Sequence, residues 1–114
     1  MINQKTLELA NELKQSKQYQ EFFKCKESID QDDFLKRLVD EYKKISLSAN
    51  AYVVAGSQIP EEINIRLESV YQMLMQSEEA QNYFIAQHNL DKLLGDIIQA
   101  LASSVGLEQH FLNE

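Results

Sequence analysis

The sequence predicts an all-α fold, an extended antiparallel hairpin or bundle of about five helices. The 114 residues include only 3 Gly and 1 Pro, too few to build the turns that join many strands. Apolar residues recur at helical spacing along most of the chain. Hydrophobic residues make up 44% of the chain and charged residues 25%, an ordinary balance for a folded protein. We therefore expect one helical domain spanning residues 1–114.

Two N-terminal helices are expected within residues 4–29. Asn3 is a suitable N-cap for the first, and Ser16 opens the second. Asp30 is expected to cap the helix that follows, because carboxylates in the next turn complement its dipole. The apolar residues at helical spacing in this region are Leu9, Leu13, Tyr19, Phe22 and Ile29.

A long central helix is predicted for residues 31–54, with return helices at 61–76 and 78–104. Gly56 suits the end of the central helix, and Pro60 suits the first position of the next one. Apolar residues alternate at spacings of three and four on both sides of this turn, which is the pattern of a coiled-coil seam. We predict an interaction face along this seam, made of Leu38, Tyr42, Ile45, Ala49, Tyr52, Leu67, Val70 and Leu74.

These eight residues have two possible roles that the sequence does not separate. They either fill the core of the hairpin or contact a second molecule. Val39, Leu47, Val53 and Val54 widen the apolar surface beyond a single seam. Such an excess is typical of a subunit or partner interface, so we expect a homodimer or homo-oligomer.

A weak internal echo is also present. Phe22 and Ile29 are matched by Tyr83 and Leu90, 61 positions later. Two similar helical arms flanking a central hairpin would produce this echo, and so would chance similarity between amphipathic helices. Identical residues at the same separation are Ser16 and Ser77, Gln20 and Gln81, Phe23 and Phe84, and Asp30 and Asp91.

The charge distribution argues against a nucleic-acid partner. Residues 1–57 hold nine basic and nine acidic residues, whereas residues 58–114 hold two basic and nine acidic, for a net charge of −7. Phosphate backbones attract basic surfaces, so direct nucleic-acid binding is not expected. The longest nearly uncharged run toward the C-terminus, Ile97 to Leu107, is far shorter than the ~20 apolar residues that span a bilayer. With no signal peptide before Ile2, we expect a cytoplasmic protein without membrane contact.

No residue set predicts catalysis, a cofactor or a metal. Cys25 is the single cysteine and is expected at a small core position, since a thiolate site needs cationic neighbours or further ligands. His88 is expected on the surface, and His110 lies in the tail. We therefore predict a protein that is not an enzyme. The alternative is a small helical ligand-binding protein or enzyme with a pocket near Arg37 or Arg66.

Several spaced residues resemble the YlbF/YmcA family over nearly the whole chain. Ser16, Tyr19, Phe22 and Cys25 follow each other at intervals of three, and Ile29 precedes Asp32 by three. After the long helix come Gly56 and the run Ile59-Pro60-Glu61-Glu62. The last part of the pattern is Tyr83, Ala86, Leu90, Leu93, Leu94 and Ile97.

The resemblance implies a cytoplasmic helical protein of Gram-positive bacteria, often dimeric. It further implies a regulatory complex that affects competence, sporulation and biofilm formation through an endoribonuclease in mRNA processing. The best-known members contribute cysteines to iron–sulfur clusters, several from C-terminal tails. This chain carries only Cys25, at a position where a small core residue usually stands. We expect a non-enzymatic adaptor or regulator that contacts other regulatory proteins.

Overall fold

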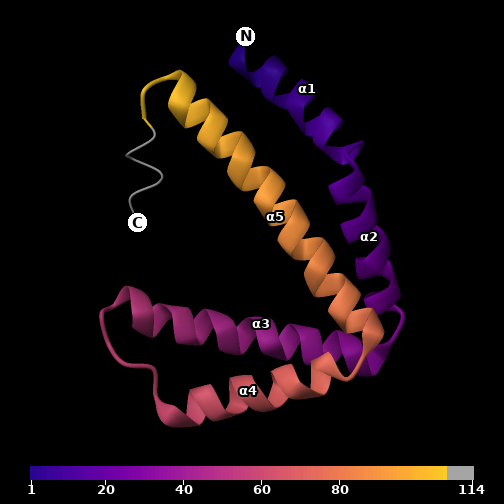
Figure 1. Ribbon diagram of the computed structural model, residues 1–114, viewed down its shortest axis with the longest axis vertical. Coiled ribbons are helices and arrows are strands. Elements are labelled where there is room, and N and C mark those ends of the chain that lie inside the picture. Colours follow the sequence, from indigo (N-terminus) through magenta and orange to yellow (C-terminus); the bar gives the residue numbers. More distant parts are fainter. Residues whose placement is uncertain (108–114) are drawn as a thin grey trace. The chain divides into compact units, whose positions relative to one another are not determined.

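The computed structural model describes residues 1–107, which form five α-helices and no strand (Figure 1). The all-α prediction is therefore confirmed. The chain divides into two compact units. Unit 1 contains Met1–Lys24 and the chain from Phe84 onward, and unit 2 contains Cys25–Tyr83. The helices are α1 (Ile2–Lys14), α2 (Lys17–Asp30), α3 (Asp33–Val54), α4 (Glu61–Met75) and α5 (Glu78–Ser104).

Two helix starts differ from the sequence prediction. Asp32, not Asp30, caps α3, and its carboxylate accepts hydrogen bonds from the backbone N–H groups of Phe34 and Leu35, both at 3.1 Å. Asp30 is instead the last residue of α2. Helix α1 begins at Ile2, one residue before the expected cap Asn3, and its N-cap makes no side-chain hydrogen bond. Asp30, Asp32 and Asp33 offer the same capping chemistry, so the sequence pattern places the start of α3 only to within a turn.

The turn between α3 and α4 follows the expected residue chemistry. Gly56 has φ +74°, a left-handed conformation that other residues adopt only with strain. Beyond it, the Ser57 N–H donates to the Tyr52 carbonyl at 2.9 Å and closes the end of α3. Pro60 is the N-cap of α4, one position before the predicted one, and the acidic pair Glu61 and Glu62 occupies the first turn.

Helices α3 and α4 pack against each other as an antiparallel hairpin within unit 2 (Figure 1). The ion pair between Arg66 of α4 and Glu41 of α3, at 2.9 Å, links the two helices and marks their register. Both residues are more than 40% exposed, so the pair adds little stability and apolar burial holds the hairpin together. The buried apolar side chains of the two helices are Leu35, Leu38, Val39, Ile45, Ala49, Val70 and Leu74.

The internal echo corresponds to two helix joints with the same hydrogen bonds. The Ser16 hydroxyl, directly before α2, accepts the N–H of Tyr19 at 3.2 Å, and the Ser77 hydroxyl, directly before α5, accepts the N–H of Ala80 at 3.2 Å. Each serine lies three residues before its donor, the geometry of a helix N-cap. The α1–α2 joint and the α4–α5 joint are therefore built alike.

A glutamine completes each joint. The side-chain amide of Gln20 donates to the Lys14 carbonyl at 2.6 Å, and that of Gln81 donates to the Met75 carbonyl at 2.7 Å. In both cases the acceptor is six residues earlier, on the last residue of the preceding helix. These bonds satisfy carbonyls that a helix end leaves without partners. Four matched hydrogen bonds favour a structural repeat over chance similarity.

Candidate protein-interaction surface

The eight residues of the predicted interaction face lie mainly inside the hairpin. Five of them, Leu38, Ile45, Ala49, Val70 and Leu74, are no more than 7% exposed. Tyr42 and Leu67 are partly buried, and Tyr52 is 38% exposed. The seam of α3 meets the seam of α4, and the five buried residues are used in that packing. A role of this face in binding a second molecule stays a prediction. Of the eight residues, Tyr52 is the most exposed to solvent.

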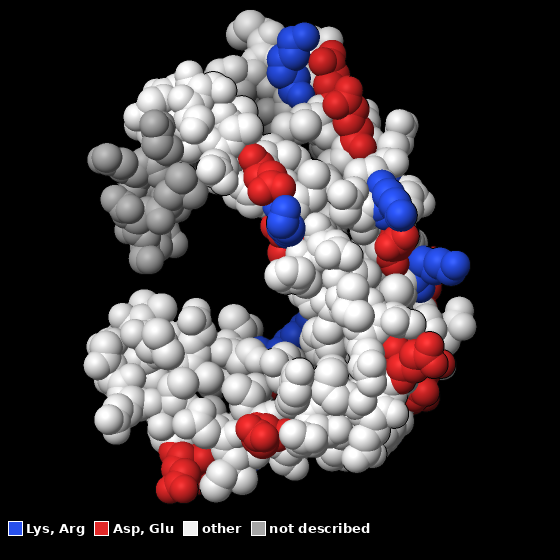
Figure 2. All heavy atoms as spheres, in the orientation of Figure 1, with Lys and Arg blue, Asp and Glu red and all other residues white. Residues whose placement is uncertain are grey.

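The end of the hairpin carries apolar side chains in contact with solvent. Leu47 is 72% exposed, Val53 58% and Val54 78%. No charged residue occurs from Ile45 to Pro60. On the face drawn in Figure 2, this end is largely white, with acidic side chains beside it. An uncharged surface with exposed Leu, Val and Tyr side chains costs little to desolvate and gains from being covered. We call residues 47–60 the hairpin end.

A second apolar region belongs to unit 1. Helix α1 has no buried residue, and its Ile2 and Leu9 are 83% and 40% exposed. The exposed apolar side chains of the C-terminal half of α5 are Leu94, Ile98 and Leu101, and Val105 follows directly after the helix. Ile97 to Leu107 contains no charge. Both faces therefore have the composition of interface surface.

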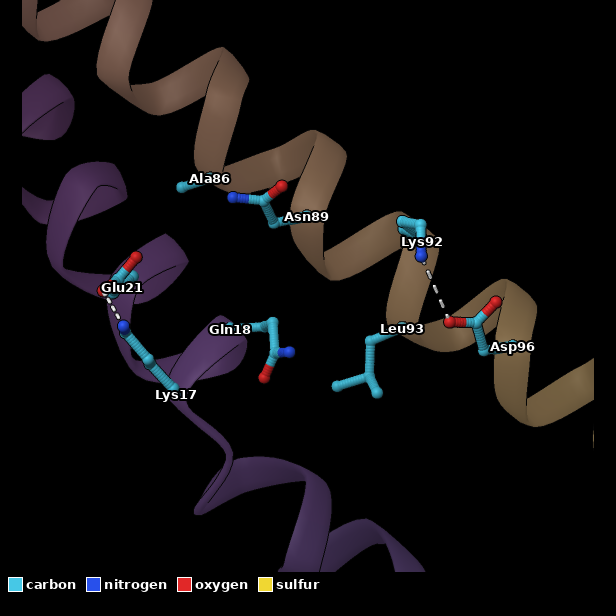
Figure 3. A pocket seen from close by; sticks show the side chains of 8 residues that line it. All are labelled: Lys17, Gln18, Glu21, Ala86, Asn89, Lys92, Leu93 and Asp96. Carbon is cyan, nitrogen blue, oxygen red and sulfur yellow. Dashed lines mark ion pairs between the residues drawn. The ribbon is translucent and has the colours of Figure 1, made fainter.

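Unit 1 also contains a polar pocket of about 280 Å³ between α2 and α5 (Figure 3). Gln18 and Leu93 point toward each other across it, and Asn89 lies above them. Its four charged side chains are paired along their own helices, with Lys17 to Glu21 at 3.9 Å and Lys92 to Asp96 at 3.6 Å. Because the charges neutralise each other at the rim, the pocket offers no concentrated charge to an ionic ligand.

A smaller pocket of about 170 Å³ lies in unit 2 and combines Lys26, Lys36 and Lys43 with Asp30 and Asp40. The Lys26 ammonium lies 2.9 Å from the Asp30 carboxylate. This hydrogen bond lowers the pKa of Asp30 below its ordinary value and raises the pKa of Lys26. The Lys43 ammonium donates to the Tyr83 hydroxyl. With three lysines and two aspartates in its lining, the pocket has a net charge close to zero.

The two arginines named in the ligand-binding alternative line neither of these pockets. The Arg37 side chain donates to the Asp33 carbonyl at 3.4 Å, one turn earlier on α3. Arg66 pairs with Glu41 on the surface of the hairpin. Each arginine thus has a structural partner, and the two do not converge on one site.

The thiol and imidazole groups are also dispersed. Cys25 is partly buried on α2, and His88 is exposed on α5. His110 lies outside the described residues. Within residues 1–107, no three His, Cys, Asp or Glu side chains are grouped as a metal site requires. An iron–sulfur cluster takes four thiolate ligands, so the single thiol does not fit a cluster held by this chain alone. None of the helices in the described part is long and apolar enough to cross a membrane.

A family model described as control of competence regulator ComK, YlbF/YmcA, matches residues 2–106. The chain belongs to the YlbF/YmcA family. A UPF0342 protein of Caldicellulosiruptor saccharolyticus is 31% identical over 101 residues, which cover 89% of this chain and 84% of that protein. UPF0342 proteins of Caldicellulosiruptor bescii and Symbiobacterium thermophilum are 28% and 26% identical, over 86% and 90% of this chain and 82% and 92% of theirs. No solved structure matches the chain.

Family membership agrees with the resemblance seen in the spaced residues from Ser16 to Ile97. The family is described by a regulatory role, and the relatives carry names that state no activity. Sequence reasoning singled out Leu47, Val53 and Val54 as excess apolar surface but did not locate them at one end of the hairpin. The uncharged run from Ile45 to Pro60 was the signal that would have located them.

Proposed function

We propose that this protein is a non-enzymatic regulatory adaptor that acts through contacts with other proteins, as a homodimer in the cytoplasm. The observation that carries the proposal is the hairpin end, where Leu47, Val53 and Val54 are 58–78% exposed in a stretch without charge. Exposed apolar side chains gathered in one place mark protein contact sites. The family description as control of a competence regulator supports a regulatory process as the setting.

The partner is a regulatory protein with an apolar, weakly charged docking surface. By family resemblance, the process is control of mRNA processing, competence, sporulation or biofilm formation. A direct RNA partner is disfavoured by the net charge of −7. Valine side chains that are covered on binding make the binding free energy more favourable because they leave water. A charged side chain placed at the same position weakens binding, because its charge must be desolvated.

The test is affinity capture from the source cytoplasm with the double variant Val53→Lys, Val54→Lys. Extracts are treated with RNase so that RNA-bridged proteins are lost. The matched control is Ile85→Lys, a residue 60% exposed on α5, away from the hairpin end in sequence. We expect the wild type and the control to retain the same specific protein. The double variant should retain at least tenfold less, as two interface side chains at ~1 kcal/mol or more each imply.

Equal recovery by all three proteins would contradict the proposal, as would recovery that disappears entirely with RNase. Circular dichroism establishes that the variants keep their helices. Because Val53 and Val54 are exposed, both substitutions should leave the stability within ~0.5 kcal/mol of the wild type.

A further inference from the structure

The structural repeat extends beyond the two joints. Helices α1 and α2 match α4 and the first half of α5 at a separation of 61 residues. Between α2 and α3 the chain leaves the helix at Gln31 and Asp32, whereas α5 continues without a break. Omitting these two residues shifts the match to 59, and four buried or partly buried residues of α3 then have apolar counterparts on α5. The matched pairs are Leu35 with Leu94, Leu38 with Ile97, Val39 with Ile98, and Tyr42 with Leu101.

The two halves of the repeat differ in what covers them. On α4, Val70 and Leu74 are 7% and 0% exposed because α4 packs on α3. Their counterparts on α1 are Leu9, which is 40% exposed, and Leu13, which is partly buried. Among residues 1–107, α3 and α4 are the helix pair that packs closely, and α1 and α5 do not pack in this way. Within residues 1–107, the chain therefore presents one α4-like stripe on α1 and one α3-like face on α5, each with apolar side chains left exposed, although Leu13 and Ile97 are partly buried.

We propose that α1 of one chain packs on the C-terminal half of α5 of a second copy, in the same way that α4 packs on α3 within one chain. The contact is reciprocal, because each copy supplies both helices, and a twofold dimer closes it. The inference rests on the homodimer of the proposed function and assigns its interface. The hairpin end takes no part in it.

The register of the contact follows from the hairpin. The Arg66–Glu41 ion pair of the antiparallel helices brings Val70 level with Leu38 and Val39, one turn further along. In the repeat, Val70 corresponds to Leu9, and Leu38 and Val39 correspond to Ile97 and Ile98. The same register therefore places Leu9 of one copy level with Ile97 and Ile98 of the other. Ile2 then lies near Val105 by the same rule. The helix lengths agree with this pairing, because α1 has 13 residues and spans ~20 Å, about the length of the C-terminal half of the 27-residue α5.

The available area is close to what a stable dimer needs. A Leu or Ile side chain exposes roughly 130 Å² of apolar surface, from ~0.8 kcal/mol per CH₂ at ~25 cal/mol per Å². Weighted by their exposed fractions, the stripe residues give roughly 400 Å² per copy, or about 800 Å² for the pair. A standard interface of ~1,600 Å² has about 900 Å² of apolar area. The residues summed are Ile2, Leu9, Leu94, Ile98, Leu101 and Val105.

The charge distribution also favours a second copy of this chain as the partner of these faces. Residues 97–107, at and just beyond the C-terminal end of α5, contain no charged side chain, so covering them leaves no unpaired charge buried. On α1, Glu8 and Lys5 pair with each other at 3.6 Å beside the apolar stripe. Two copies thus meet without like charges facing each other across the apolar strip.

The experiment is disulfide cross-linking between copies in a Cys25→Ala background, with position 25 matched by Ala86 in the repeat. Protein carrying Leu9→Cys is mixed with protein carrying Ile98→Cys under mild oxidation. We expect a disulfide-linked heterodimer that forms at least tenfold faster than in a mixture of Leu9→Cys with Ile85→Cys. Ile85 is 60% exposed on the same helix and lies about half a turn of the helical wheel away from Leu94.

A chain with both Leu9→Cys and Ile98→Cys tests closure within one molecule. If this double variant forms an intrachain disulfide while the mixture of single variants forms no heterodimer, α1 folds onto its own chain and the proposal is wrong. The solution mass gives a second measurement, in which Leu101→Glu is expected to yield single chains and Ile85→Glu to leave the dimer intact. Dimers that persist in Leu101→Glu would overturn the assigned interface. Partner capture through Val53 and Val54 is measured separately, so its loss or survival does not affect this result.

Discussion

Replacing Leu74 with alanine is expected to destabilise the protein by ~3–5 kcal/mol. Leu74 is 0% exposed on α4, where it faces the core of the hairpin. The substitution removes three carbons, worth about 2.4 kcal/mol at ~0.8 kcal/mol each, and a cavity term adds to this loss. With a urea dependence of ~1.5 kcal/mol per M, the unfolding midpoint should fall by about 2–3 M.

Leu13→Ala is the matched control, because Leu13 is the repeat counterpart of Leu74 on α1. It is only partly buried, and α1 has no fully buried residue. We expect a loss of about 1 kcal/mol or less. The assay is urea unfolding followed by circular dichroism, at a concentration where the solution mass is that of one chain, since association would stabilise the folded state. Equal losses for both variants would refute the conclusion that α4 is covered within the chain and α1 is not.

Three further predictions follow from single positions. Ser16→Ala and Ser77→Ala should each cost ~1 kcal/mol in urea unfolding, because each removes the cap of a matched joint, and a loss confined to one of them would contradict the repeat. Gly56→Ala should cost ~1 kcal/mol, because φ +74° strains any side chain, although nothing lies within 4 Å of the added Cβ; an unchanged midpoint would contradict this reasoning. The pKa of Asp30 is lowered by Lys26, so the ion pair stabilises the fold above the ordinary carboxyl pKa and is lost as the pH falls through the folded pKa. In an NMR titration, Lys26→Met should return the pKa of Asp30 toward its ordinary value, and an unmoved titration would show that Lys26 is not the cause.

The sequence predicted the helices well because their signals are local. Gly56 and Pro60 mark the one turn whose residues allow few alternatives, and the apolar spacing on either side identifies the two helices that pair. The start of α3 was predicted less well, since Asp30 and Asp32 are equally good caps and only the hydrogen bonds of Asp32 distinguish them.

The candidate surface was harder to predict than the fold. Spacing alone shows that Leu38 belongs to an apolar stripe on one helix and Val70 and Leu74 to a stripe on the next, but it does not show whether either stripe meets another helix of the same chain. The answer depends on which helices pack, and that is a property of the three-dimensional structure. The echo between Ser16 and Ser77 is informative because it identifies two equivalent joints. The helix before the second joint, α4, has buried residues, whereas the helix before the first, α1, has none.

The central claim is that the hairpin end contacts a protein partner, and site-specific photo-crosslinking in the source cell tests it most directly. A photoreactive amino acid replaces Val54, which is 78% exposed, or Lys44, an exposed charged residue on the same helix. We expect one discrete cross-linked product that contains another protein from position 54 and little or none from position 44. Absence of a product at position 54, or the same products at both positions, would contradict the claim.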